Sequence, residues 1–305
     1  MRVSSQQVFN TGLQSVQKHT NEAVQAQQQI SSGKRFALAS DNALAAGLGI
    51  QAEINSSQFA MYKVNQDHIN ATMAATDTQL KSVTDMLLRY QQLLVQGSND
   101  TLSTEGRQLI GMELESLRSA IYGAVNTLDA NGDSILKQVP SEDVRESLVA
   151  PAIALRTNIA YQEVMGLQEA GGAFTQRGTG SGTVPTYDAA TIFIDGRIDV
   201  EQFLSVSAER LLNGLKPTAD DLAYMENARS QVTQAHIAAG VISNRLEAAT
   251  QLAETQKMNA ELMRSTLLDT DIAEASANLV KANALLQAAQ AIMAKLGQNT
   301  LFERL

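Results

Sequence analysis

The chain has 305 residues, a formal net charge of −9 and no cysteine. The acidic balance, without a basic run, excludes nucleic acid and anionic membrane surfaces as predicted partners, and the lack of cysteine excludes disulfides and thiol chemistry. Aromatic residues make up only 4% and tryptophan is absent, which is typical of coiled-coil packing rather than of a compact enzyme core. The N-terminal residues carry no apolar signal segment and no run is long enough to span a membrane, so we expect export, if any, without a cleaved signal.

All four prolines lie between residues 140 and 217. Proline lacks a backbone donor and clashes inside a helix, so it separates helical from non-helical stretches. The predicted fold is therefore mainly α: an elongated helical rod of coiled-coil-like helices from both chain ends, with a small α+β insert domain at 140–217.

The residue pattern of the N-terminal arm, residues 1–139, predicts three helices. The first carries apolar residues at spacings of four and three, and it ends at Ser31-Ser32-Gly33 because glycine suits a helix C-cap. A second helix is predicted to begin after Asp41 as its N-cap and to end at the turn 97–100. The third runs to Leu128. The apolar positions of the first helix that we assign to an interface are Phe9, Leu13, Val16 and Ile30.

The residue pattern of the insert predicts short strands and one helix. Strand-like runs occur at 159–165 and at 191–194, the second beside the turn Asp195-Gly196. Residues 200–215 form an amphipathic helical pattern, and the glycine-rich segment 178–183 is predicted to be a linker. A small mixed domain fits this pattern.

The C-terminal arm has the most regular pattern. A helix with apolar residues from Met225 to Ala253 is followed by a one-residue phase slip, which predicts a hinge within 265–269. The last helix alternates large apolar residues with alanines that let neighbouring helices approach closely. Its predicted interface positions are Leu268, Ile272, Ala275, Leu279, Ala282, Leu286, Ala289, Met293 and Leu296.

These terminal seams carry too few large side chains to order the two arms alone. We therefore expect residues 1–30 and 270–305 to be mobile in the monomer and to fold when copies assemble.

The sequence predicts no catalytic, cofactor-binding or metal-binding residue. His19, His68 and His236 lie on separate predicted helices without metal-ligand spacing. The segment starting at Asp129 imitates a calcium loop, but Ser134 and Pro140 replace the glycine and glutamate that such a loop needs. We therefore predict that the protein is not an enzyme and uses no cofactor.

Three motifs resemble the bacterial flagellin superfamily: Ser31-Ser-Gly33-Lys-Arg35 followed by Asp41, the stretch 86–99, and Leu267-Leu-Asp-Thr-Asp271. The resemblance covers about 1–135 and 218–305. Within the superfamily, Met1-Arg-Val-Ser4 and Leu301-Phe-Glu-Arg-Leu305 resemble the hook-filament junction branch, whereas Asn42-Ala43 is closer to filament flagellin.

The resemblance implies a secreted structural subunit of the extracellular bacterial flagellum that forms the junction between hook and filament. Its expected partners are itself in a ring or tubular layer, an adjoining hook-associated protein, flagellin, and a cytoplasmic export chaperone on the C-terminal helix; export would be of type III, with no nucleic acid and no membrane as partner. The alternatives are a filament-forming flagellin and, from another class, a secreted adhesin-like binding module acting through 140–217. The expected domains are 1–40 plus 268–305 for assembly, 41–139 plus 218–267 as a helical bundle, and 140–217 as an outer domain.

Overall fold

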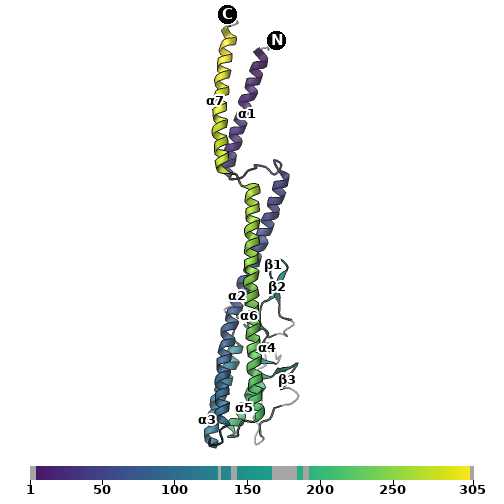
Figure 1. The fold of residues 1–305 in the computed structure, drawn as a ribbon, viewed down its shortest axis with the longest axis vertical. Helices are drawn as coiled ribbons and strands as arrows, with labels where there is room; N and C mark the ends of the chain where they lie inside the picture. Colours follow the sequence, from purple (N-terminus) through teal and green to yellow (C-terminus); the bar gives the residue numbers. More distant parts are fainter. Residues whose placement is uncertain (1–4, 130–131, 139–142, 167–183, 188–191, 303–305) are drawn as a thin grey trace. The chain divides into compact units, whose positions relative to one another are not determined.

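The computed structural model describes residues 5–129, 132–138, 143–166, 184–187 and 192–302 (Figure 1). Within these residues most of the chain is helical, which confirms the mainly α class. The elements are α1 (Ser5–Ser32), α2 (Ala43–Gly97), α3 (Thr104–Val125), β1 (Glu146–Ala150), β2 (Ile153–Arg156), α4 (Tyr161–Met165), β3 (Phe193–Ile194), β4 (Arg197–Ile198), α5 (Val200–Leu212), α6 (Ala219–Leu268) and α7 (Ile272–Phe302).

The chain divides into two compact units. The terminal unit comprises residues 1–58 and 255–305, and the central unit comprises residues 59–254. The long helices α2 and α6 contribute residues to both units. Each unit has its own packing and is described separately.

The central unit has one hydrophobic core, built from α2, α3, α5, α6 and the short elements between α3 and α5. Its largest fully buried side chains include Tyr90 and Phe203. The predicted seam of α2 is confirmed, because all of its positions are buried: Ile69, Met73, Leu80, Val83, Leu87, Tyr90 and Leu94. On α6 the predicted positions are buried as far as Ala253: Met225, Ala228, Val232, Ala235, Ala239, Ile242, Leu246, Ala249 and Ala253. The seam predicted on α6 also included Met263 and Leu267, but Met263 is exposed and Leu267 is half-buried.

Side-chain caps fix where the helices of the central unit begin. The Ser103 hydroxyl accepts a hydrogen bond from the Gly106 N–H (3.1 Å) at α3, and Asp199 accepts from the Gln202 N–H (2.9 Å) at α5. At α6, Thr218 and Asp221 form a reciprocal capping pair, in which the Thr218 N–H donates to Asp221 Oδ2 (2.6 Å) and the Asp221 N–H to Thr218 Oγ1 (3.3 Å).

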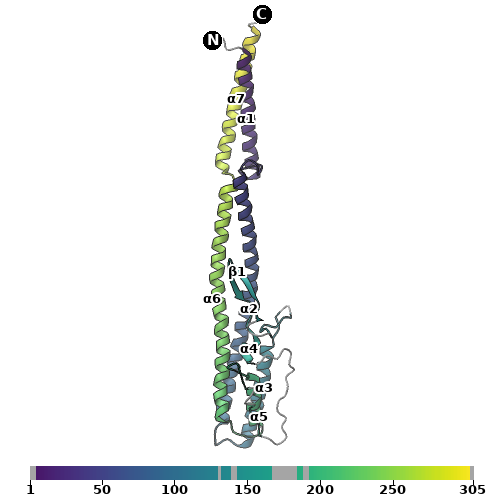
Figure 2. The same cartoon turned by 90° about the vertical axis from the view of Figure 1, so that its right-hand side faces the viewer.

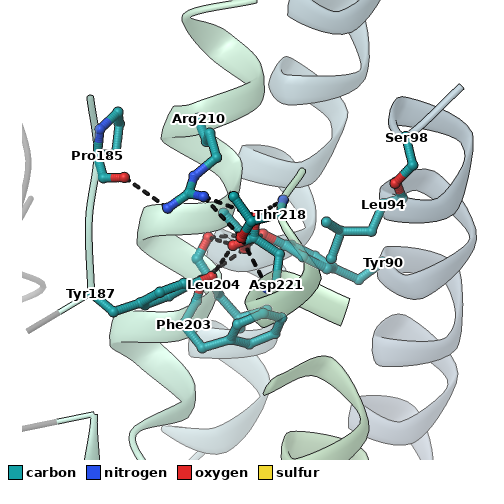
Figure 3. A network of polar contacts seen from close by, with 11 residues as sticks. Tyr90, Leu94, Ser98, Pro185, Tyr187, Phe203, Leu204, Arg210, Thr218 and Asp221 are labelled. Carbon is teal, nitrogen blue, oxygen red and sulfur yellow. Dashed lines mark hydrogen bonds and ion pairs between the residues drawn. The ribbon is translucent and has the colours of Figure 1, made fainter. Parts of the chain in front are cut away.

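The same Asp221 belongs to a buried polar network (Figure 3). Its carboxylate lies 3.4 Å from the Arg210 guanidinium and accepts a hydrogen bond from the Tyr187 hydroxyl. Arg210 also donates to the Pro185 carbonyl (2.7 Å). The side chains of Arg210 and Asp221 are both almost fully buried. Each therefore neutralises the charge of the other, which would otherwise be costly to bury.

Two antiparallel hairpins pack in the central unit. β1 pairs with β2, with a bulge between Leu148 and Ala150, and the hairpin is held on α2 by Asn65, which donates to the Leu148 carbonyl (2.7 Å), and by Gln66, which donates to the Val149 carbonyl (2.6 Å). β3 pairs with β4 around Asp195-Gly196. This second hairpin confirms the predicted strand and turn.

Four local predictions from the sequence are wrong, one in the type of element and three in where a helix begins or ends. The strand-like run 159–165 contains the helix α4, because the Glu163 carboxylate accepts from the Ala160 N–H (3.1 Å) and closes a first helical turn. Asn42, rather than Asp41, caps α2 by accepting from the Ala45 N–H (3.0 Å). The helix predicted over 200–215 ends at Leu212, before Gly214 with φ +72°, and α3 ends at Val125 instead of Leu128. The predicted linker 178–183 lies outside the described residues.

Candidate functional site

The terminal unit contains a hairpin of α1 and α7, which lie side by side with both chain ends at the same end of the hairpin (Figures 1 and 2). The two helices approach closely at Gly12, where an added Cβ would lie 2.5 Å from Met293 Sδ. Six buried or half-buried positions of α1 repeat every four and three residues: Gly12, Val16, His19, Ala23, Ala26 and Ile30. Ser15 and Gln29, each next to one of these positions, are also half-buried.

This seam differs in part from the one assigned to α1 from sequence. Val16 and Ile30 are half-buried in the hairpin, whereas Phe9 and Leu13 are exposed. Gly12, His19 and Ala26 were not predicted from the sequence because they are not large apolar residues. The signal that could have found them is the small size of Ala23 and Ala26, which matches the alanines of α7.

On α7 and the turn before it, the assigned positions differ in burial. Ala275 and Ala282 are buried, and Ile272 is exposed. The half-buried positions are Leu268, Leu279, Leu286, Ala289 and Met293, and the side chain of Leu296 lies outside the described residues.

A short backbone pairing joins the loop after α1 to the turn between α6 and α7. We call it the clasp, formed by residues 33–35 and 268–270. The Arg35 N–H donates to the Leu268 carbonyl (2.7 Å) and the Thr270 N–H donates to the Gly33 carbonyl (3.0 Å). Gly33 adopts φ +67°, a left-handed conformation that favours glycine. Because α6 ends at Leu268, the hinge predicted within 265–269 is confirmed.

The other motif residues shape this turn. Asp271 caps α7 by accepting from the N–H groups of Ala273 (2.8 Å) and Glu274 (3.2 Å). Leu268 packs on Gly49, where an added Cβ would lie 2.5 Å from Leu268 Cδ1. Asp41 accepts from the Leu38 N–H (3.0 Å). The remaining assigned residue, Ser31, donates to the Gln28 carbonyl (3.2 Å). The motif residues therefore cap the helices and fix the backbone conformation around the hinge.

Packing in the terminal unit reverses the usual relation between size and burial. Among its described residues, the buried hydrophobic side chains are six alanines: Ala23, Ala26, Ala45, Ala52, Ala275 and Ala282. Its large hydrophobic side chains are half-buried or exposed. We name the exposed set the terminal apolar surface: Phe9, Leu13, Val24, Leu38, Leu44, Leu48, Ile50, Ile54, Met258, Leu262, Met263, Ile272, Val280, Leu285 and Ile292.

Charges add little to the hairpin. The His19 ring bonds to the Glu22 carboxylate (2.9 Å), and this hydrogen bond holds the pKa of Glu22 below its usual value. Lys18 lies 3.9 Å from the same carboxylate. Such exposed pairs within one helix contribute little to stability because water screens them. The hairpin therefore depends on its alanine seam.

No group of three or more His, Cys, Asp or Glu side chains in the described part of the chain is placed to hold a metal ion. A hollow of about 380 Å³ beside the clasp is lined mainly by polar side chains such as Gln29, Asp269 and Asn278. Within the described ranges, no helix combines the length and apolar character needed to cross a membrane.

A hairpin with small residues inside and large apolar residues outside defines a helical assembly subunit. The model of the bacterial flagellin N-terminal helical region matches residues 3–140, and that of the bacterial flagellin C-terminal helical region matches residues 222–302. Together they match well over half of the chain, which belongs to the bacterial flagellin family.

Individual relatives come from two branches of the family. The chain is 22% identical to flagellar hook-associated protein 3 of Salmonella typhimurium over 326 aligned positions, covering 99% of both chains. It is 25% identical to the Escherichia coli protein of that name over 142 residues, which is 47% of this chain and 45% of that protein. Flagellin of Bacillus subtilis is 25% identical over 282 residues, covering 89% of this chain and 88% of that one.

A solved structure of a flagellar hook-associated protein from Vibrio parahaemolyticus is similar in fold. It aligns with a TM-score of 0.57 at 18% identity, covering 75% of this chain and all of that one. This likeness supports the fold, and the family models establish the family.

Proposed function

We propose that this protein is a structural subunit of the bacterial flagellum that forms the junction between hook and filament and assembles through its terminal unit. The observation that carries the proposal is the terminal apolar surface, which leaves large side chains in water around a seam of alanines. Monomeric soluble proteins rarely expose so many large apolar side chains on one unit, and such surfaces mark contacts with other proteins.

Assembly provides the burial that the isolated unit lacks. A Val, Leu or Ile side chain contributes roughly 1.5–3 kcal/mol when it is fully buried, and the terminal unit leaves most of that contribution unused. Gly47 supports the same conclusion. It is exposed within α2, next to the exposed Leu48 and one turn after Leu44, and nothing lies within 4 Å of a Cβ built on it. A glycine weakens a helix. Close approach of a neighbouring copy would explain why a glycine occupies this position.

The junction branch has more support than filament flagellin. The alignment with the Salmonella hook-associated protein 3 runs over nearly all of both chains, and both ends of the sequence resemble the junction branch. Residues 1–4 and 303–305, which carry part of that resemblance, lie outside the described residues. Filament flagellin is the second candidate, favoured by the similarity to the Bacillus subtilis protein.

The proposed partners follow from this position in the flagellum. The terminal unit, which includes the predicted assembly segments 1–40 and 268–305, would contact other copies, the adjoining hook-associated protein and flagellin. Residues 140–217 would form the outer part. Before export by the flagellar type III route to the extracellular flagellum, a cytoplasmic chaperone would cover α7, whose Val280 and Ile292 are 70% and 60% exposed.

Electron microscopy of the purified protein, alone and with isolated hook ends that carry the preceding junction protein, tests the proposal. We expect a short layer confined to the hook ends. Open-ended filaments would establish flagellin instead. A protein that forms no ordered layer under either condition would overturn the proposal and direct attention to the binding module predicted as an alternative.

A further inference from the structure

The central unit carries its own exposed apolar position on α6, formed by Ile237, Gly240 and Val241. We name it the α6 notch. Ile237 and Val241 are 61% and 50% exposed, and nothing lies within 4 Å of a Cβ built on Gly240. The isolated chain therefore gives no packing reason for a glycine in the middle of this helix, where alanine would be more stable.

The same feature occurs on α3 at Gly123. It is exposed, and nothing lies within 4 Å of a Cβ built on it. Small exposed residues, Ser119 and Ala120, lie one turn before it, and the exposed Leu128 follows α3. We name these four residues the α3 face.

Contacts with α2 place the two glycines at one level of the central unit. His236, one turn before Gly240, bonds to Asp77 (2.6 Å). The Gln79 amide donates to the carbonyl of Ala124, the residue after Gly123. Because Asp77 and Gln79 are two residues apart on one helix, the notch and the face lie at nearly the same height along α2.

We propose that the α6 notch of one copy packs against the α3 face of the next copy. This inference rests on the self-assembly proposed above. A closed ring repeats one contact between two different faces of each subunit, and two faces at one level fit a flat layer. The glycines let two helix backbones approach closely, while Ile237 and Val241 on one copy and Leu128 on the other flank the contact.

Complementary charges beside the α6 notch and the α3 face support a second copy of the chain as the partner of the notch. Arg245 lies one turn after Val241, is exposed, and forms no ion pair within the part of the chain that the structure describes. The loop that follows α3 carries Asp129 and Asp133, and the Asp133 carboxylate is exposed, with Lys137 at 3.9 Å. In the proposed contact the basic residue of one copy therefore approaches the acidic loop of the next.

Cysteine cross-linking tests this contact directly, because the natural chain has no cysteine. We would prepare Gly123→Cys, Gly240→Cys and the double variant, assemble each on hook ends and oxidise them. A disulfide needs Cα atoms about 4.4–6.8 Å apart. We expect a ladder of covalent oligomers from the double variant, dimers from a mixture of the two single variants, and monomers from either single variant alone.

The outcomes separate this inference from the proposed function. If the double variant assembles on hook ends and stays monomeric after oxidation, the lateral contact is wrong while the proposed function stands. Dimers from one single variant alone would indicate a symmetric contact and also contradict it. If even the natural chain fails to assemble, both proposals fail.

A size series at Gly240 gives a second test with an internal control. Gly240→Ala and Gly240→Leu should both raise the melting temperature of the monomer, because each removes a helical glycine. Gly240→Leu should also raise the concentration needed for assembly at least tenfold, and Gly240→Ala by much less. Unchanged assembly of the leucine variant would overturn the contact, and the melting temperature shows that the variant is folded.

Discussion

The two units of this protein use the same helical periodicity with opposite sizes of side chain. In the terminal unit the buried side chains among the described residues belong to alanines, and residues such as Leu44 and Val280 are exposed. In the central unit Tyr90, Leu87 and Phe203 are fully buried. A regular seam can therefore serve either to stabilise a monomer or to bring helices close enough for neighbouring copies to complete the packing.

A spectroscopic difference makes the comparison easy to test. All six tyrosines lie between residues 59 and 254 and the chain has no tryptophan. Tyrosine fluorescence therefore reports the central unit, while far-ultraviolet circular dichroism reports the helices of both units.

Val280→Asp should abolish assembly and leave the monomer intact. The side chain is 70% exposed in the monomer, but assembly would bury an unpaired carboxylate at a cost of several kcal/mol per contact. Since each 1.4 kcal/mol is a factor of ten, the concentration needed for assembly should rise at least 100-fold. Sedimentation measures the concentration needed for assembly. Asn283→Asp, which places a carboxylate at another exposed position of α7, is the control and should assemble at a lower concentration than Val280→Asp.

The opposite behaviour is expected in the central unit for Asp221→Ala. The substitution leaves the Arg210 guanidinium buried without its carboxylate, which costs about 3–5 kcal/mol. The tyrosine-detected unfolding transition in urea should move to a lower concentration. A shift below about 1 kcal/mol would show that water reaches Arg210 and that the network contributes little.

Alkaline pH should destabilise the central unit selectively. Burial raises the pKa of Tyr90, and burial together with Asp221 raises the pKa of Tyr187. A folded pKa above the unfolded value of about 10 gives stability that is present below that pH and is lost as pH rises. For Tyr90 alone, the loss should approach 1.4 kcal/mol per pH unit above about 10.

Urea unfolding between pH 9 and pH 11.5 tests this expectation. Tyr90→Phe removes the ionisable group and should flatten the pH dependence, although it also removes the hydrogen bonds to the Leu204 carbonyl and Ser207. An equal pH dependence in the natural chain and in Tyr90→Phe would contradict the assigned role.

The smallest effect is expected for the cap of α7. Asp271→Ala removes two backbone hydrogen bonds, and the loss of an N-cap typically costs about 1 kcal/mol. The helical signal of the terminal unit should decrease while the tyrosine transition stays in place. Asp271→Asn, which retains a side-chain acceptor, is the matched control and should keep most of that signal.

The sequence predicts the central helices well because their seams contain large residues. Positions such as Leu80 and Leu114 stand out at four-three spacing and are buried, whereas Leu128, at the end of the same pattern on the third predicted helix, is exposed. The turn Asp195-Gly196 and the stop at Gly33 were also predictable, because they need positive φ angles that few residues adopt readily. The hinge near Leu268 follows from the shift of the apolar face.

The terminal seam was harder to predict because it consists of small residues. Gly12 and Ala26 carry almost no hydrophobic signal, yet Gly12 is where Met293 packs. Apolar spacing also fails to show whether a residue such as Phe9 faces its own chain or a neighbour. The capping error at Asp41 arose because Asp and Asn favour the same position, and only the structure shows which one accepts the helix N–H.

Hydrogen exchange of the dilute monomer and of the assembled layer tests the central claim most directly. We predict rapid exchange of the amides of α1 and α7 in the monomer, strong protection of both helices after assembly, and strong protection of residues 69–94 of α2 in both states. Slow exchange throughout α1 and α7 in the monomer would contradict the account, because it would show that the alanine seam alone orders the terminal unit.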